Sequence, residues 1–130
     1  MIRFWNPETL PKPGSRYSQL ALATGTTQRL EIAGQVGIHP DGTLATGLAA
    51  QLDAAFANVD AALAAANMTR ANLMKITVYL TENTPASVTT YRARRDAWAG
   101  TATPPAATLL IVAGLANPGW LVEVDAVAAA

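Results

Sequence analysis

The stretch Leu73-Met74-Lys75-Ile76-Thr77-Val78-Tyr79-Leu80 alternates between apolar and more polar side chains, and Thr84-Pro85 follows shortly after it. Alternation of this kind is the pattern of a strand with one buried face. A threonine followed by proline favours a helix start, because the threonine side chain caps free backbone amides and proline suits the first helical position. The stretch therefore predicts a strand over 73–80 that leads into a helix from 85 to about 98.

The segments on both sides extend this pattern. From 47 to about 67, large apolar residues recur at intervals of three or four, which predicts an amphipathic helix; they are Leu48, Leu52, Phe56, Val59 and Leu63. Two strands are expected before it, at 17–24 and 28–37, joined as a hairpin by a short loop at Gly25. Two more are expected at 107–113 and 120–128, separated by Asn117-Pro118-Gly119 and forming a second hairpin.

This order of elements predicts an α+β fold: one mixed sheet with two helices on one face, in a single domain over residues 1–130. The other face of the sheet would be uncovered and largely apolar. Only 14% of the residues are charged, against about 25% in typical soluble domains. Both features favour contact with further copies of the chain.

Composition argues against several classes of protein. Nine basic and nine acidic residues cancel, which disfavours nucleic acid as a partner. No apolar run approaches the roughly 20 residues of a membrane span, and the N-terminus lacks a signal-peptide core, so a cytoplasmic location is expected. There is no cysteine, and His39 is the only histidine. We therefore expect no metal site and no cofactor.

Three blocks of sequence, in order, resemble the RidA (YjgF) family and together span about 110 residues. The first is Tyr17-Ser18-Gln19 after Pro13-Gly14. The second contains Ile32-Ala33-Gly34-Gln35-Val36-Gly37, then Pro40-Asp41-Gly42, Gln51 and Asn58. The third runs from Ile76-Thr77-Val78-Tyr79-Leu80 through Tyr91, Trp98 and Pro105 to Glu123. The resemblance implies a chorismate-mutase-like fold and a homotrimer with a central barrel, whose ligand clefts lie at the subunit interfaces.

The resemblance also implies roles for individual residues. In members that hydrolyse enamines and imines, an arginine clamps the substrate carboxylate, a glutamate positions water, and a tyrosine closes over the ligand. The last two match Glu123 and Tyr17, whereas the arginine position is Ala107. The cleft would further be lined by Ala33, Gly34 and Gln35, with Ala33 replacing a common serine or threonine.

Two other arginines are candidate replacements for the missing clamp. Arg16 adjoins Tyr17, and Arg92 falls at a helical position that often holds asparagine in the family. Arg92, Arg94 and Arg95 form a basic run, however, and such runs are usually solvated helix faces.

Plain structural roles compete with these functional interpretations. Glu123 lies between two valines, where a carboxylate is costly unless it is paired, so it is either functional or at an exposed end of the sheet. Tyr17 has the character of an amphipathic edge residue, and Gln35 could equally be structural.

The sequence leaves two functions open. The first is a hydrolase or deaminase-like enzyme acting on a small imine, enamine or related metabolite other than simple 2-imino acids. The second is a trimer that binds a small metabolite without turning it over. In either case the loss of the arginine predicts a less polar cleft that prefers a neutral or bulkier ligand. RNA cleavage fits poorly with zero net charge.

Overall fold

The computed structural model describes all residues from Met1 to Ala130. Its elements, in chain order, are β1 (Ile2–Trp5), β2 (Leu20–Ala23), β3 (Arg29–Val36), α1 (Leu48–Ala65), the short 3-10 helix η1 (Arg70–Asn72), β4 (Leu73–Leu80), α2 (Pro85–Ala99), β5 (Ala106–Ile111) and β6 (Val122–Ala129). No helix combines the length and the apolar character that crossing a membrane requires.

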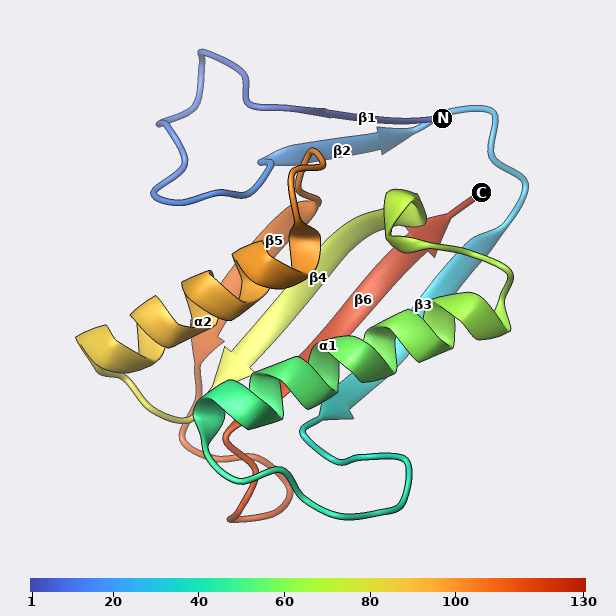
Figure 1. Ribbon diagram of the computed structural model, residues 1–130. Coiled ribbons are helices and arrows are strands. Elements are labelled where there is room, and N and C mark those ends of the chain that lie inside the picture. The colour runs from blue at the N-terminus through green and yellow to red at the C-terminus, as the bar shows by residue number, and fades with distance from the viewer.

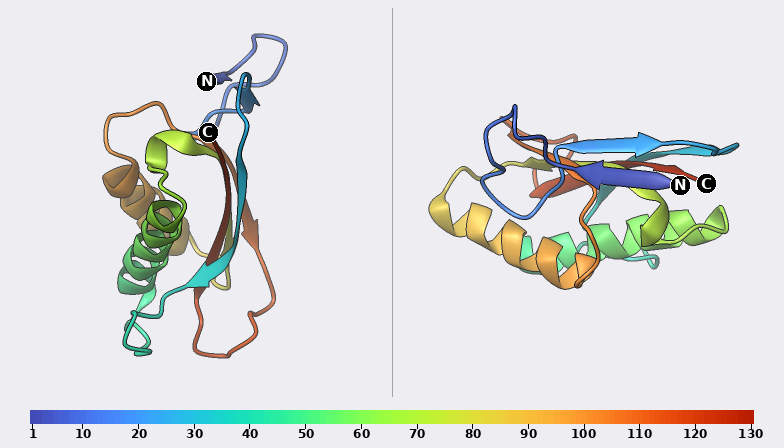
Figure 2. Two further views of the ribbon diagram at one scale, coloured as in Figure 1. Left: turned by 90° about the vertical axis from the view of Figure 1, so that its right-hand side faces the viewer. Right: turned by 90° about the horizontal axis from the view of Figure 1, so that it is seen from above.

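Four strands form the main sheet in the order β3-β6-β4-β5 (Figure 1). β4 and β5 are parallel, whereas β6 is antiparallel to both of its neighbours. Both helices cover one face of this sheet and leave the other bare (Figure 2). The predicted fold class, a mixed sheet with two helices on one face, is confirmed.

The two predicted hairpins are wrong. β2 does not pair with β3; it pairs with β1, a strand that the sequence did not predict, and the two form a separate ribbon. The chain end fixes this ribbon, because the amino terminus donates to the carbonyl of Thr24 over 2.8 Å. At the other end of the chain, β6 inserts between β3 and β4 and never pairs with β5.

The core lies between the sheet and the helices. The apolar stripe of α1 is fully buried at Leu52, Phe56, Val59 and Leu63, and it packs against inward-facing valines and leucines of β4 and β6. α2 begins with the predicted cap: the amide of Ser87 donates to the Thr84 hydroxyl over 3.0 Å, and Pro85 follows the cap. Such a capping box satisfies amides that would otherwise lack partners.

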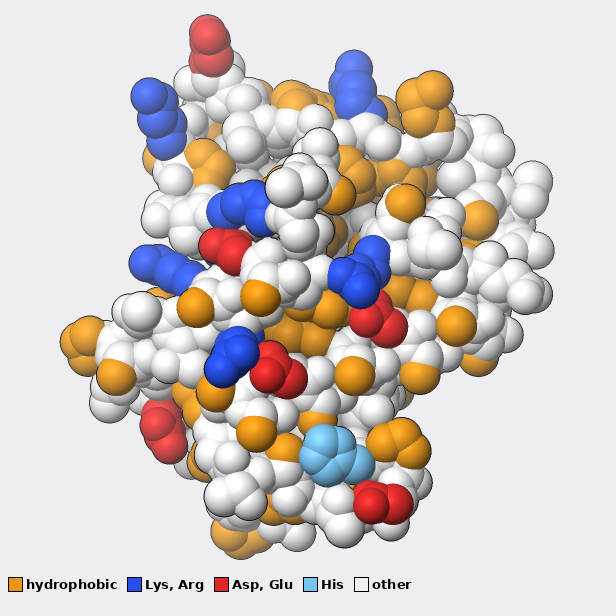
Figure 3. Space-filling view, in the orientation of Figure 1, with side chains coloured by type: hydrophobic (Ala, Val, Ile, Leu, Met, Phe, Trp, Pro, Cys, Tyr) orange, Lys and Arg blue, Asp and Glu red, His pale blue; other side chains and the backbone are white.

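Aromatic and charged pairs join the two helices. The rings of Phe56 and Trp98 stack with their centroids 4.4 Å apart. The indole of Trp98 donates to the carboxylate of Asp60, which also pairs with Arg70 at 3.0 Å. On the solvent side of the helices, basic and acidic side chains lie next to one another (Figure 3).

The bare face of the sheet is more polar than predicted. Lys75, Thr77 and Tyr79 of β4 alternate with buried residues, and so do Glu123 and Asp125 of β6. The register places Tyr79 beside Glu123 and Thr77 beside Asp125. Because the inward positions of both strands are taken by apolar residues, every charged side chain of these two strands faces outward.

Candidate functional site

The segment before β2 is held against the start of β5, and this places Tyr17. The amide of Ser18 donates to the carbonyl of Pro105 over 3.1 Å, and its hydroxyl donates to the carbonyl of Pro104 over 2.6 Å. Ser18 is buried and forms an isolated parallel β-bridge with Ala106. Tyr17 therefore lies beside Ala107, although the two are far apart in sequence.

A cavity of about 400 Å³ opens at this edge of the sheet, between β5 and α2. It is lined by Gly14, Ser15, Tyr17, Tyr91, Arg92, Arg95, Ala107, Thr108 and Leu109. Three predicted site residues thus come together: Tyr17, Arg92 and Ala107. Ala107 pairs in register with Ile76 and packs against the core, so it lies on the helix-covered side of the sheet.

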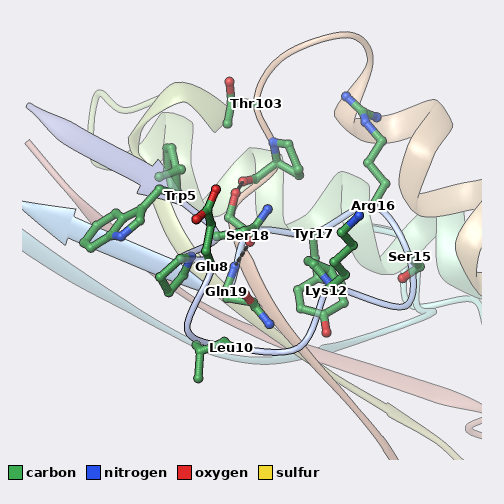
Figure 4. A pocket seen from close by; sticks show the side chains of 15 residues that line it. Trp5, Glu8, Leu10, Lys12, Ser15, Arg16, Tyr17, Ser18, Gln19 and Thr103 are labelled. Carbon is green, nitrogen blue, oxygen red and sulfur yellow. Dashed lines mark hydrogen bonds between the residues drawn. The ribbon is translucent and has the colours of Figure 1, made fainter.

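A larger cavity of about 820 Å³ adjoins the first and shares Ser15 and Tyr17 with it. It is formed mainly by the N-terminal segment, with Trp5 and Glu8 on one side and Tyr17 and Lys12 on the other (Figure 4). We centre the candidate site on the smaller cavity, because it gathers three predicted residues instead of two.

Arg16 is not free to act as a clamp in this structure. Its guanidinium donates to the carbonyl of Ala102 over 2.7 Å and lies 4.0 Å from the carboxylate of Asp96. Figure 4 shows the side chain extending toward the end of α2, away from Tyr17. Of the two predicted replacements, only Arg92 lines the smaller cavity, where it is exposed.

Arg95 is the cavity residue that the sequence interpretation missed. It is only 4% exposed, so the prediction of a solvated basic face is wrong for this position. Arg94, by contrast, is exposed and pairs with Asp53 across the helices at 3.5 Å. A signal was present: positions 88, 91, 95 and 98 are spaced three, four and three, which places residue 95 on the inward stripe of α2.

A second group of predicted residues lies on the bare face of the sheet. A Cβ atom added at Gly34 would come within 2.6 Å of Cδ and 2.7 Å of Oε1 of Glu123. The Glu123 side chain therefore packs directly on the backbone of β3, at a position where an added Cβ would force the carboxylate to move. The register shift between Ile32 and Gln35 places Ala33 and Gly34 outside the regular ladder.

Neighbouring groups make this region acidic. The phenol of Tyr79 donates to Oδ2 of Asp125 over 2.9 Å. That hydrogen bond, together with desolvation and the negative charges of Asp125 and Glu123, raises the pKa of Tyr79 above its ordinary value. Gln35 is separate, since its side-chain amide donates to the carbonyl of Ala33 within its own strand.

The predicted site residues thus form two groups on opposite faces of one sheet. Tyr17, Arg92 and Ala107 lie at the β5 edge on the helix side, and Gly34 and Glu123 contact each other on the bare side toward β3. Ala33 adjoins Gly34 in the chain. One chain does not bring Glu123 near Ala107. No group of three or more His, Asp or Glu side chains is arranged to hold a metal ion.

The sheet order, the two helices on one face and the cavity at the edge strand define a small α+β protein of the RidA type. The chain belongs to the family described as Endoribonuclease L-PSP, whose model matches residues 8–130. This confirms the resemblance drawn from the three sequence blocks.

Individual relatives agree with this assignment. A RutC family protein of Aquifex aeolicus is 41% identical over 73 residues, a match that spans 55% of this chain and 56% of that protein. A solved structure of a Rid-family protein of unknown function from Yersinia pestis is 31% identical, covers 99% of this chain and 98% of its own, and has a TM-score of 0.90. The RidA of an Antarctic Psychrobacter is 25% identical, covers 98% and 99%, and has a TM-score of 0.73.

Proposed function

We propose that this protein is a small-molecule hydrolase acting on imines or enamines, with its site formed where two copies of the chain meet in a homotrimer. The observation that carries the proposal is the contact between Glu123 and Gly34. A carboxylate is laid on a glycine backbone, on a sheet face that no helix covers. Partial burial of a carboxylate costs free energy, so packing alone does not explain an acid at this position.

In the proposed reaction, Glu123 accepts a proton from a water molecule while the water oxygen bonds to the carbon of the C=N group. Glu123 passes this proton to the nitrogen, which gives a carbinolamine. As the C–N bond breaks, the nitrogen takes the proton of the new hydroxyl group and leaves as ammonia, which yields a carbonyl compound. The backbone of Gly34 lies beside Glu123, and the amides of Ala33 and Gly34 stand outside the regular ladder. They are suited to stabilise negative charge that develops in the transition state.

The two-chain arrangement follows from the separation of the two groups within one chain. Tyr17 and Ala107 lie at the β5 edge, and Glu123 lies on the opposite face. A ligand can touch both groups only if the cavity of one copy faces the bare sheet of another. The trimer that the family resemblance implies supports such an arrangement.

The proposed substrates exclude simple 2-imino acids because of Ala107. In place of a guanidinium on β5, the side chain here offers no hydrogen bond to a carboxylate. Two charge-assisted hydrogen bonds contribute about 1.5–3 kcal/mol each. Their loss slows the reaction of these small acids far more than that of larger or neutral imines.

The proposal is tested by generating imines enzymatically and measuring the ammonia released with and without the protein. We expect faster release from neutral or bulkier imines than from the 2-imino acids of serine or threonine, and loss of that rate in Glu123→Gln. The matched control is Glu31→Gln, which removes an acid of β3 that pairs only with the exposed Arg29. If Glu123→Gln keeps the full rate, the assignment of Glu123 is wrong.

The alternative is a trimer that holds a metabolite without turning it over. Ala107 favours it, because the residue removed is the clamp of the family's hydrolytic members. Binding of an imine or its carbonyl product, with no ammonia released from any imine tested, would decide for this alternative.

A further inference from the structure

We propose that Arg95, presented by α2, binds the carboxylate group of a small organic ligand in the cavity at β5. A guanidinium would thus enter the site from the helix instead of from the strand at Ala107. The inference rests on the proposed function in one respect, since this cavity is half of the proposed site. Binding by Arg95 does not itself require turnover.

The first observation is an unsatisfied charged group. Arg95 has only 4% of its surface exposed, and its Nη2 has no hydrogen-bond partner. The other nitrogens are engaged: Nε donates to Asp96 over 3.1 Å, and Nη1 donates to the hydroxyl of Ser15 over a long 3.3 Å. Buried donors in native proteins nearly always have a partner. Nη2 is therefore the one nitrogen of the Arg95 guanidinium that has no acceptor among the protein atoms.

The second observation is the chemistry of the cavity wall. Among its nine lining residues are two arginines, Arg92 and Arg95, and no acid. The hydroxyls of Ser15, Tyr17 and Thr108 add further donors. Asp96 is the nearest counter-charge to Arg95, and it is shared with Arg16 at the end of α2. A cavity with this lining favours a negatively charged ligand group.

The third observation concerns the orientation of the guanidinium. Its carbon lies 5.2 Å from the ring centre of Tyr91, one turn earlier on α2, and the contact restricts its plane. A restrained planar fork suits a carboxylate, which offers two oxygens in one plane. Ala107 lines the same cavity and, through its small size, leaves room for the ligand.

This inference narrows the expectation of a neutral or bulkier ligand to the bulkier kind. The missing arginine removes the clamp on β5, but the cavity itself remains basic. The favoured ligand is therefore an organic acid whose carboxylate reaches the helix side of the cavity. Its reactive carbon then lies at a different distance from the carboxylate than in the family's usual substrates.

The test measures thermal unfolding of the full protein with sodium butyrate, with butyramide and with sodium chloride at equal ionic strength. A ligand that binds only the native state raises the melting temperature in proportion to its occupancy. We expect butyrate to raise it, and butyramide and chloride to leave it unchanged. In Arg95→Leu the butyrate-induced shift should vanish, with affinity by calorimetry reduced at least tenfold.

Arg94→Leu is the matched control, because it removes a neighbouring arginine that does not line the cavity; it should keep the shift. If Arg95→Leu fails to fold, Ala107→Leu fills the cavity from β5 with Arg95 in place and should abolish the shift. Glu123→Gln should keep it, so that failure of the proposed catalysis can be told from failure of this inference. A shift equal for butyrate and butyramide, or one retained in Arg95→Leu, would overturn the proposal.

Discussion

The Glu123 carboxylate rests on the Cα of Gly34, and this contact requires the absence of a side chain there. Gly34→Ala would place a methyl group 2.6 Å from Cδ of Glu123. The clashing atoms are at the end of a flexible side chain, so the carboxylate can move aside. We expect a stability change below about 1 kcal/mol but a loss of activity of about 100-fold, measured by denaturant unfolding and ammonia release.

Gly37→Ala is the informative comparison, because its methyl group would meet the backbone of α1, 2.6 Å from Cα of Gln51. A helix backbone cannot move aside cheaply, so this variant should lose about 1–3 kcal/mol of stability. If Gly34→Ala is the more destabilising of the two, the contact with Glu123 is structural and not a catalytic device.

The Tyr79–Asp125 pair predicts a pH dependence. Because the pKa of Tyr79 is raised in the folded protein, this group stabilises the fold below its unfolded pKa of about 10. That contribution is lost as the pH rises through the raised value. Absorbance titration of tyrosinate, read as the difference between the wild type and Tyr79→Phe, should show the raised pKa. Asp125→Asn should bring it down; an unchanged titration would contradict the hydrogen bond.

Residue identities in the candidate site were predictable to different degrees. Gly34 and Glu123 stand out from the sequence blocks, but their contact depends on a bulge in β3 that no local pattern reveals. The burial of Arg95 was not predicted, because a run of basic residues is normally exposed. Only the spacing from Tyr91 and Trp98 indicates that one member of the run faces inward. Its burial depends on Ser15, which is brought there from far along the chain.

At the scale of elements, Gln51 of α1 ties the helix to the loop that leads into β6. It is 2% exposed; its amide donates to the carbonyl of Gly119 over 3.0 Å, and its oxygen accepts from the amide of Leu121 over 2.8 Å. Both contacts lie just before Glu123. The same helix uses Asn58 to reach the carbonyl of Ile38 after β3 over 2.8 Å. α1 therefore braces the ends of both strands that carry the Glu123–Gly34 contact.

We predict that Gln51→Leu lowers the free energy of unfolding by about 1–3 kcal/mol, because two backbone groups lose their partners in a buried place. Gln28→Leu, at an exposed position, is the control and should change it by less than about 0.5 kcal/mol. Denaturant unfolding gives both values. Equal stability of the two variants would show that the loop does not depend on this brace.

The positions of the elements were largely predictable, whereas their pairing was not. Helical periodicity and the Thr84-Pro85 cap fixed α1 and α2, and alternation fixed β4. Neighbouring strands were expected to form hairpins, but β6 pairs with β3 and β4 in the middle of the sheet. Its alternation shows that one face is buried and does not show which strands are its neighbours. β1 escaped prediction because a four-residue strand beside a chain end carries too little periodicity to be recognised.

At the scale of the whole molecule, the bare sheet face is the feature that a single chain leaves without a partner. Its acids and tyrosine are too polar for a hydrophobic core, yet β5 also exposes Leu110 and Ile111 at its edge. A mixed surface of this kind suits an interface that both packs and encloses a polar site.

We predict a stable homotrimer, with a mass by light scattering of three times 13.5 kDa. Leu110→Lys, which places a charge among the exposed apolar residues of β5, should weaken the assembly, whereas Leu22→Lys on β2 should not. A monomer at micromolar concentration would remove the proposed two-chain site.

The central claim is that Glu123 of one chain faces Ala107 of another, and cross-linking tests it most directly. The protein has no cysteine, so Glu123→Cys combined with Ala107→Cys can be joined by a short bis-maleimide without background. The account predicts covalently linked trimers, with none from either single variant or from Ala57→Cys on the exposed side of α1 combined with Ala107→Cys. The account is contradicted if the variant with Glu123→Cys and Ala107→Cys gives no cross-linked trimer. It is also contradicted if the variant with Ala57→Cys and Ala107→Cys gives as much of it.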